Sequence, residues 1–381
     1  MGNKSKRSGG WKRRLQDLID ANNGRHSTRG KVVGHKTRDE RAASLFRSFK
    51  RLREMGFKLE DPAHLGGRHI GCLMRDWTAD PELKAELAAH GVRYEPRDEP
   101  LSPAYIQQQL SFLRVLSGWI GKPGLVLPAD AYVARHLVAR QTTAQRDRSW
   151  TGNAVDPTRV LAQVASRCPR TALILEVMLA YGLRRKEAVM FVPTLAEVPA
   201  HALPVSADPG PYLAFLRIKR GTKGGRLRYT AIRHPSQARA LARALEAAPN
   251  GGHIGYPGLS LKQALRRFSN TLHRAGVNMK VLGVTAHGVR HQFAADLFIE
   301  LAEVPPPVRG GGPVDAATMR AAYLAVAEQL GHGRAQIAGA YLGRRDGRAA
   351  AAGAGLESVE RSTDQATCAA YRRERLRSHA V

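Results

Sequence analysis

Residues 330–341 read Leu-Gly-His-Gly-Arg-Ala-Gln-Ile-Ala-Gly-Ala-Tyr and form the most informative stretch of the chain. His332 is followed nine residues later (341 − 332 = 9) by Tyr341. A tyrosine hydroxyl can attack phosphorus and store the broken bond as a covalent ester, and an imidazole nearby can bind a phosphate oxygen or support the tyrosine. Taken alone, Tyr341 fits a core tyrosine on a short amphipathic helix equally well, so its meaning depends on the motifs upstream.

Two arginine motifs precede this stretch. Residues 287–291 read His-Gly-Val-Arg-His, so on a helix His287 and Arg290 stand three residues apart and point to one side. Residues 182–184 read Gly-Leu-Arg and end at Arg184. Arginine suits a phosphate clamp because its planar guanidinium meets two oxygens and stays charged. We expect Arg184 and Arg290 to be clamps, while His287 can receive the nucleophile's proton or bind a phosphate oxygen.

A basic, glycine-rich turn lies between the two arginine motifs. Residues 212–218 and 226–232 are short strand-like runs, and the turn that joins them predicts a β-hairpin. This turn carries Lys219 and Lys223. A mobile lysine can reach the leaving oxygen of a cleaved phosphodiester and donate a proton to it. Both lysines are therefore candidates for a general acid, and a solvated charged turn is the alternative interpretation.

The order Arg, Lys, His-x-x-Arg, His, Tyr resembles the tyrosine recombinase (phage integrase) family over residues 156–345. The resemblance favours Lys223 over Lys219, because the hairpin lysine of the family is followed by basic residues three and five places on. It implies a metal-free, cofactor-free catalytic set of Arg184, Lys223, His287, Arg290, His332 and Tyr341, supported by Glu187 and His291. DNA-binding residues are expected at Lys219, Arg220, Arg226 and Arg228.

The composition agrees with a nucleic-acid partner. The chain has 60 Lys and Arg against 32 Asp and Glu, a net charge of +28. Such an excess favours a polyanion, because neutralising phosphates releases counterions. No long basic amphipathic helix, spanning apolar stretch or secretory signal is predicted, so a membrane partner is not expected. The scattered cysteines Cys72, Cys168 and Cys368 have no metal-site spacing and indicate a reducing compartment, so we expect a cytoplasmic, nucleoid-associated protein.

Periodicity predicts a mainly α protein with a small β-hairpin or sheet in its catalytic domain. Apolar residues recur every three or four positions in several segments, including 38–55 and 103–120, and no strand is expected before residue 150. With the resemblance, this gives the two-domain tyrosine-recombinase architecture. The predicted parts are a basic arm (1–37), a helical, SAM-like core-binding domain (38–140), a linker (141–155), a mixed α/β catalytic domain (156–345) and a Gly/Ala-rich basic tail (346–381). The Pro/Gly-rich stretch 304–313 is expected to be an external insertion.

The resemblance implies a site-specific recombinase that cleaves double-stranded DNA through a 3′-phosphotyrosine without metal or ATP. Exchange between two duplexes implies a homotetramer in the synaptic complex, with an accessory DNA-bending protein as a further partner. Integration of a mobile element is favoured over dimer resolution, because the N-terminal arm and the insertion at 304–313 are unlike compact resolvases. The alternatives are a type IB-like topoisomerase, a catalytically silent DNA-binding protein with the same fold, and a basic architectural protein.

Overall fold

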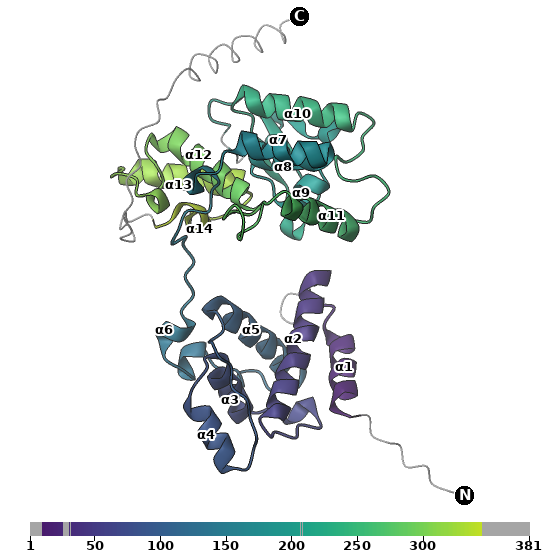
Figure 1. Ribbon diagram of the computed structural model, residues 1–381, viewed down its shortest axis with the longest axis vertical. Coiled ribbons are helices and arrows are strands. Elements are labelled where there is room, and N and C mark those ends of the chain that lie inside the picture. Colours follow the sequence, from purple (N-terminus) through teal and green to yellow (C-terminus); the bar gives the residue numbers. More distant parts are fainter. Residues whose placement is uncertain (1–9, 26–29, 31, 206, 208, 345–381) are drawn as a thin grey trace, which may run out of the picture. The chain divides into compact units, whose positions relative to one another are not determined.

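The chain forms two compact units, Met1–Gln141 and Thr142–Val381. The computed structural model describes residues 10–25, 30, 32–205, 207 and 209–344 (Figure 1). The predicted tail at 346–381 and the first nine residues of the predicted arm lie outside the described residues. The mainly helical fold with a small sheet, as predicted from the sequence, is confirmed.

Among its described residues, unit 1 contains helices and turns with one isolated β-bridge between Arg25 and Val32. The predicted helix at 103–120 begins with Ser102, whose hydroxyl accepts a hydrogen bond from the backbone of Tyr105 at 3.4 Å. Its apolar positions pack with those of the other helices into one core. The helices are α1 (Trp11–Asn22), α2 (His35–Glu54), α3 (Gly67–Trp77), α4 (Glu82–Ala89), α5 (Pro103–Trp119) and α6 (Arg135–Val138), with 3₁₀ turns at Pro62–His64 and Ala129–Ala131.

The predicted basic arm is wrong for residues 11–22, because this segment is helix α1 of unit 1. Leu15 and Ile19 are buried in the core of the unit, and Trp11 stacks on Phe49 with ring centroids 6.1 Å apart. The basic residues between them occupy the outer face of the same helix. Charge therefore conceals an amphipathic pattern here, and burial of its apolar face fixes the segment to the unit.

Unit 2 combines helices with a three-stranded antiparallel sheet of order β1-β2-β3. The predicted hairpin is confirmed as β2 (Ala214–Ile218) and β3 (Arg228–Ala231), with Leu216 opposite Thr230, and β1 (Glu197–Pro199) adds an edge strand. The helices are α7 (Pro157–Arg167), α8 (Pro169–Tyr181), α9 (Arg185–Val189), α10 (Pro235–Ala247), α11 (Leu261–Arg274), α12 (Gly288–Ala302), α13 (Ala316–Gln329) and α14 (Gly339–Leu342). The 3₁₀ turns are Thr151–Asn153, Pro193–Leu195, Ala200–Ala202, Lys223–Gly225, Pro307–Arg309 and Ala335–Ala338.

Two hydrophobic clusters support unit 2. One surrounds α8 and includes Tyr181, while the other joins α12, α13 and α14 and includes Tyr323 and Tyr341. The second cluster holds the C-terminal motif against α12, which carries Arg290. Packing therefore brings the last motif of the sequence to the second arginine motif. Within the described residues, no helix combines the length and the apolar character needed to cross a membrane.

Two loop predictions need correction. Residues 142–155 are not a free linker, because Trp150 is fully buried in unit 2 and its indole Nε1 donates to the Thr285 carbonyl at 2.9 Å. The stretch 304–313 is not simply external, since Arg309 forms an ion pair with Asp147 at 2.6 Å. Both segments lack periodicity because their order comes from contacts with residues far away in the sequence.

Candidate active site

Arg184 stands between two helices of unit 2. Helix α8 ends at Tyr181 and is capped by Gly182, and Arg184 is the residue before α9. The buried carboxylate of Glu187 accepts from the Arg184 backbone at 2.8 Å and from its Nη1 at 2.7 Å. The guanidinium is thus held by one edge, while 26% of the side chain remains exposed. This arrangement leaves part of its hydrogen-bonding capacity free for a ligand.

Arg290 lies fully buried on α12. Its Nη1 donates to the Gly182 carbonyl, its Nη2 donates to the Leu330 carbonyl at 2.6 Å, and its Nε donates to the Tyr341 hydroxyl at 3.0 Å. Burial and the neighbouring arginines lower the pKa of Arg290 to about 10, which still leaves it charged at neutral pH. These contacts fix the planar group between α8 and the C-terminal motif.

The structure contradicts the predicted role of Arg228 in DNA binding, because this residue is only 4% exposed. Its Nη2 donates to Glu187 at 2.9 Å and its Nη1 donates to Thr230 at 2.7 Å and to the Gln329 carbonyl. Alternation along β3 places Arg228 and Thr230 on the same face of the strand. Arg228 therefore lies beneath the site and positions Glu187 rather than meeting DNA.

Arg228 also explains the glycine of the Leu-Gly-His motif. A Cβ on Gly331 would lie 2.4 Å from the Cδ of Arg228, and the backbone there has φ of +73°. Only glycine combines that conformation with so close an approach. The buried arginine and the turn that carries His332 are consequently matched to each other.

His332 lies next to both Arg184 and Arg290. Its Nε2 lies 3.4 Å from the Nη2 of Arg184 and 3.4 Å from the Nη2 of Arg290. Because both guanidinium groups can only donate, Nε2 must accept, so the neutral ring carries its proton on Nδ1. Partial burial, together with Arg290 and Arg184, lowers the pKa of His332 to about 4. The imidazole is therefore neutral at pH 7.

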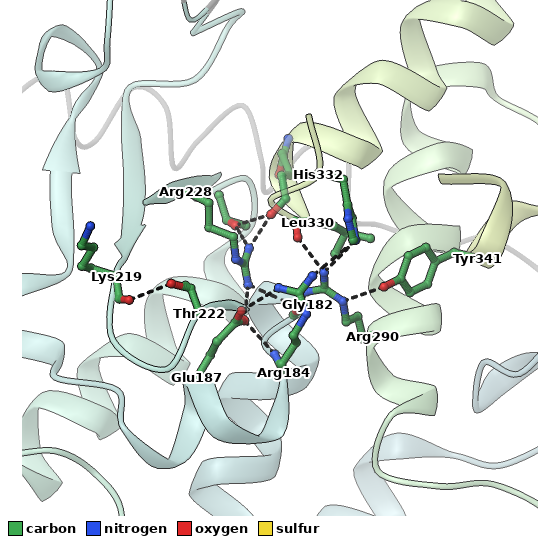
Figure 2. Close-up of polar contacts among 12 residues, drawn as sticks. Gly182, Arg184, Glu187, Lys219, Thr222, Arg228, Arg290, Leu330, His332 and Tyr341 are labelled. Atoms are coloured by element: carbon green, nitrogen blue, oxygen red, sulfur yellow. Dashed lines mark hydrogen bonds and ion pairs between the residues drawn. The ribbon is translucent and has the colours of Figure 1, made fainter. Parts of the chain in front are cut away.

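Tyr341 points its hydroxyl into this arginine cluster, as Figure 2 shows. The side chain is 8% exposed, and its ring lies 4.8 Å from the His291 ring and 6.1 Å from the His332 ring, measured between centroids. A guanidinium hydrogen bond stabilises the tyrosinate form that a nucleophile needs. The predicted nucleophile and the predicted clamp are thus in direct contact.

His287 and His291 flank the tyrosine on its other side. The His287 ring reaches solvent just before α12, and its centroid is 6.3 Å from that of Tyr341. His291 is buried, and its Nδ1 has no hydrogen-bond partner among the described residues. Partial burial at His287 and burial at His291 lower the pKa of each histidine to about 4, helped by Arg290 and Arg184 at His287 and by the neighbouring His287 at His291. Both are neutral and able to accept a proton.

The remaining predicted residues lie on the exposed hairpin turn. Lys219, Arg220, Lys223 and Arg226 are all exposed. No polar contact within the described part of the chain joins the Lys223 side chain to the other five predicted catalytic residues, and Figure 2 shows the Lys219 amine directed away from the cluster. The structure therefore brings together Arg184, Arg290, His332 and Tyr341 with His287 beside them, and leaves Lys223 at the surface.

Comparison with known proteins gives a family. Residues 151–296 match the family model for integrases. Residues 151–296 therefore form a domain of the integrase family, the family that the sequence motifs predicted. The predicted family and enzyme class, a site-specific recombinase, are confirmed. Arg184, Lys223, His287 and Arg290 of the recombinase domain fall inside the matched segment, and His332 and Tyr341 follow it.

Solved recombinases resemble the chain only distantly. A lambda integrase tetramer bound to a Holliday junction gives 14% identity and a TM-score of 0.49 over 93% of this chain and 82% of that one. A lambda integrase dimer bound to a COC′ core site gives 15% identity and a TM-score of 0.47 over 91% of this chain and 80% of that one. The XerH site-specific recombinase bound to difH gives 14% identity and a TM-score of 0.44 over 87% of this chain and 81% of that one. No curated protein matches the recombinase by sequence. The family match therefore carries the assignment.

Proposed function

We propose that this recombinase cleaves and rejoins double-stranded DNA at specific sites through a 3′-phosphotyrosine at Tyr341, using neither metal nor ATP. The observation that carries the proposal is the hydrogen bond of 3.0 Å from the buried Arg290 to the Tyr341 hydroxyl, with Arg184 and His332 beside it. These groups offer positive charge and donors next to a nucleophile, which is the arrangement that phosphoryl transfer requires.

In the first step, the Tyr341 oxygen attacks the scissile phosphorus and the bond from phosphorus to the 5′-oxygen breaks. Arg184 and Arg290 bind the non-bridging oxygens, on which charge accumulates, and His332 accepts from both guanidinium groups and so helps to orient them. The phenolic proton passes to His287, which is neutral at pH 7 and whose low pKa rises when a phosphate offsets the neighbouring arginines. The bond energy is kept in the tyrosyl ester.

Lys223 supplies the proton for the leaving 5′-oxygen in this proposal. It is exposed on a turn with two glycines, Gly224 and Gly225, so it has the freedom to reach bound DNA. Lys223→Ala then slows cleavage of normal DNA, and a 5′-bridging phosphorothiolate, whose leaving group needs no proton, rescues it. Rescue of Lys219→Ala instead would transfer the role to Lys219.

In the second step, the 5′-hydroxyl of a partner strand attacks the ester and releases Tyr341. Exchange between two duplexes needs four protomers, and we propose a tetramer on DNA, cytoplasmic and acting at the nucleoid. An accessory DNA-bending protein and mobile-element integration are the partner and the biological role we favour. A type IB-like topoisomerase would share the first step but rejoin the original strand.

The test uses a supercoiled plasmid carrying the DNA that flanks the gene. Wild type and Tyr341→Phe are incubated with it in EDTA, and detergent then traps covalent complexes. We expect an adduct with wild type only, while both proteins bind DNA with similar affinity. Recombinant junctions support recombination, whereas relaxed circles without junctions support a topoisomerase. Equal adduct formation by Tyr341→Phe would refute the proposed nucleophile, and salt-sensitive binding without any adduct would favour a silent DNA-binding protein.

A further inference from the structure

The segment from 142 to 151, here called the strap, contacts the nucleophile segment directly. It begins at the first residue of unit 2. The backbone N–H of Ala144 donates to the carbonyl of Gly339 at 2.8 Å. Gly339 is the first residue of α14 and stands two residues before Tyr341. The strap therefore holds the start of the short helix that carries the nucleophile.

The other end of the strap contacts the helix that carries Arg290. Trp150 donates to the Thr285 carbonyl, and the backbone and hydroxyl of Thr151 donate to the Gln292 Oε1 at 2.9 and 2.8 Å. A Cβ on Gly288 would lie 2.7 Å from the Arg148 carbonyl and 2.8 Å from the Trp150 Cδ1, so the strap presses against the start of α12. One continuous segment thus contacts both the helix that carries Arg290 and the helix that carries Tyr341.

Arg309 fastens the strap from outside. Its Nε donates to the Asp147 carboxylate at 2.6 Å, and its Nη2 donates to the hydroxyls of Ser149 at 2.5 Å and Thr151 at 3.2 Å. The side chains of Asp147 and Arg309 are only 12% and 18% exposed. Burial raises the pKa of Asp147, but hydrogen bonds from Ser149 and the charge of Arg309 outweigh it and lower the pKa. The carboxylate is therefore ionised and paired at neutral pH.

Helix α14 needs such external support. It spans only Gly339–Leu342 and follows a 3₁₀ turn, and a helix of one turn does not hold its own orientation. The turn Pro307–Arg309 contacts α14 as well as the strap. A displacement of about 1 Å at a reacting group can cost roughly 100-fold in rate. The orientation of Tyr341 therefore depends on contacts outside its own helix.

We propose that Arg309 is a positioning residue, which fixes the strap so that the strap holds Tyr341 against Arg290. The inference rests on the proposed function of Tyr341 as the nucleophile. Arg309 touches no reacting atom in this account. It acts through Asp147, Ser149 and the bond from Ala144 to Gly339.

Hydrogen exchange of the free protein tests the physical link without any DNA. Arg309→Ala is compared with Arg320→Ala, which removes an exposed arginine of α13. We expect Arg309→Ala to speed exchange about 10-fold or more in two peptides together, 142–145 and 339–342, and to leave α8 unchanged. Faster exchange in the strap with no change at 339–342 would overturn the proposal.

Single-turnover cleavage of pre-bound DNA tests the consequence for Tyr341. We expect Arg309→Ala to form the covalent adduct about 10- to 100-fold more slowly, with DNA affinity within about twofold of wild type. Arg309→Lys recovers part of the rate, because its ammonium still pairs with Asp147, and Arg320→Ala keeps the wild-type rate. A purely structural role would instead change the midpoint of unfolding without this separation of binding from cleavage.

An engineered disulfide between the strap and α14 tests whether cleavage by Arg309→Ala can be restored. The Cβ of Thr143 lies 3.9 Å from the position of a Cβ on Gly339, close to the separation of about 3.8 Å that is usual in disulfides. In the Arg309→Ala background, oxidised Thr143→Cys/Gly339→Cys restores cleavage and a reductant removes it again. Loss of cleavage on oxidation of the same pair in the presence of Arg309, or a wild-type rate for Arg309→Ala, refutes this inference alone. Absence of adduct from wild type refutes the proposed function.

Discussion

Each unit of the chain contains a cluster of arginines around a buried carboxylate, and the two clusters differ in charge. In unit 1, Arg51 and Arg97 bind Asp76, and Arg51 also binds Glu54, so two positive charges meet two negative ones. In unit 2, Arg184 and Arg228 bind Glu187, and Arg290 lies beside them without a carboxylate among its described contacts. The sum there is three minus one, an excess of two positive charges.

The difference separates a structural cluster from a binding site. A neutral cluster, such as that around Asp76, satisfies its charges internally. The excess in unit 2 is costly unless an anion joins it, and the partly exposed guanidinium of Arg184 is the group that such an anion can reach. A DNA phosphate supplies both the negative charge and the acceptor oxygens. Substitutions of residues in and beside the cluster of unit 2 test this difference.

The largest effect is expected from Arg290→Lys. An ammonium keeps the charge but cannot serve the Gly182 carbonyl, the Leu330 carbonyl and the Tyr341 hydroxyl at once, because it lacks the fork of the guanidinium. Adduct formation should fall about 1,000-fold, comparable with the loss of a transition-state donor. Single-turnover kinetics on saturating DNA measures the rate. A loss below about tenfold would mean that charge alone suffices.

The second largest effect is expected from Arg184→Ala, which should lower the cleavage rate about 100-fold or more and leave the free energy of unfolding nearly unchanged. Its side chain is partly exposed, so its removal uncovers Glu187 rather than leaving a cavity. The matched control is Arg185→Ala, which removes the next arginine, an exposed one that donates to Ser269. Similar cleavage rates for the two variants would contradict the clamp role of Arg184.

Glu187→Gln should destabilise the protein by about 3 kcal/mol at pH 7. Burial raises the pKa of Glu187, but Arg228 and the hydrogen bonds from Arg184 lower it from 4.5 to about 2. Because the folded-state pKa is the lower one, this stabilisation is present above about pH 4.5 and is lost as the pH falls towards 2. The free energy of unfolding, measured with urea at several pH values, should fall less steeply below pH 4.5 for Glu187→Gln than for the exposed control Glu246→Gln. Equal pH dependence of the two variants would exclude this contribution of Glu187.

The smallest effect is expected from Arg226→Ala, on the surface of the hairpin turn. Arg226 is exposed and Arg228 is buried, although they stand two residues apart. Arg226→Ala should weaken DNA binding and reduce the slope of log affinity against log salt by about one, with unfolding unchanged. Arg228→Ala should instead lower stability by about 3–5 kcal/mol, since it leaves Glu187 buried with one partner fewer. If Arg226→Ala lowered stability and Arg228→Ala only weakened DNA binding, the structural role assigned to Arg228 would be wrong.

Local patterns were sufficient to predict much of this molecule. Three- and four-residue periodicity predicted the helices now seen as α2 and α5, and the order of the motifs predicted which arginines, histidines and tyrosine come together. Helix α1 was missed although Trp11, Leu15 and Ile19 share one face, because the basic residues around them indicated an arm. That signal was present in the sequence and was misinterpreted.

Other features had no local signal. The burial of Arg228 depends on Glu187 and Gln329, which are 41 and 101 residues away in the sequence. Trp150 is ordered by a carbonyl 135 residues downstream. Alternation in β3 places Arg228 on the same face as Thr230, and this is the one sequence feature that could have indicated its burial. Contacts between distant segments, rather than propensities, decide which of several nearby arginines reaches the surface.

The central claim is that the excess charge in unit 2 prepares a phosphate for attack by Tyr341. Its most direct test is mass spectrometry of the covalent complex formed with wild type in EDTA, after digestion with trypsin and nuclease. The account predicts a nucleotide joined through its 3′-phosphate to the peptide that contains Tyr341. A 5′-linked nucleotide, or attachment to any other side chain, would contradict it.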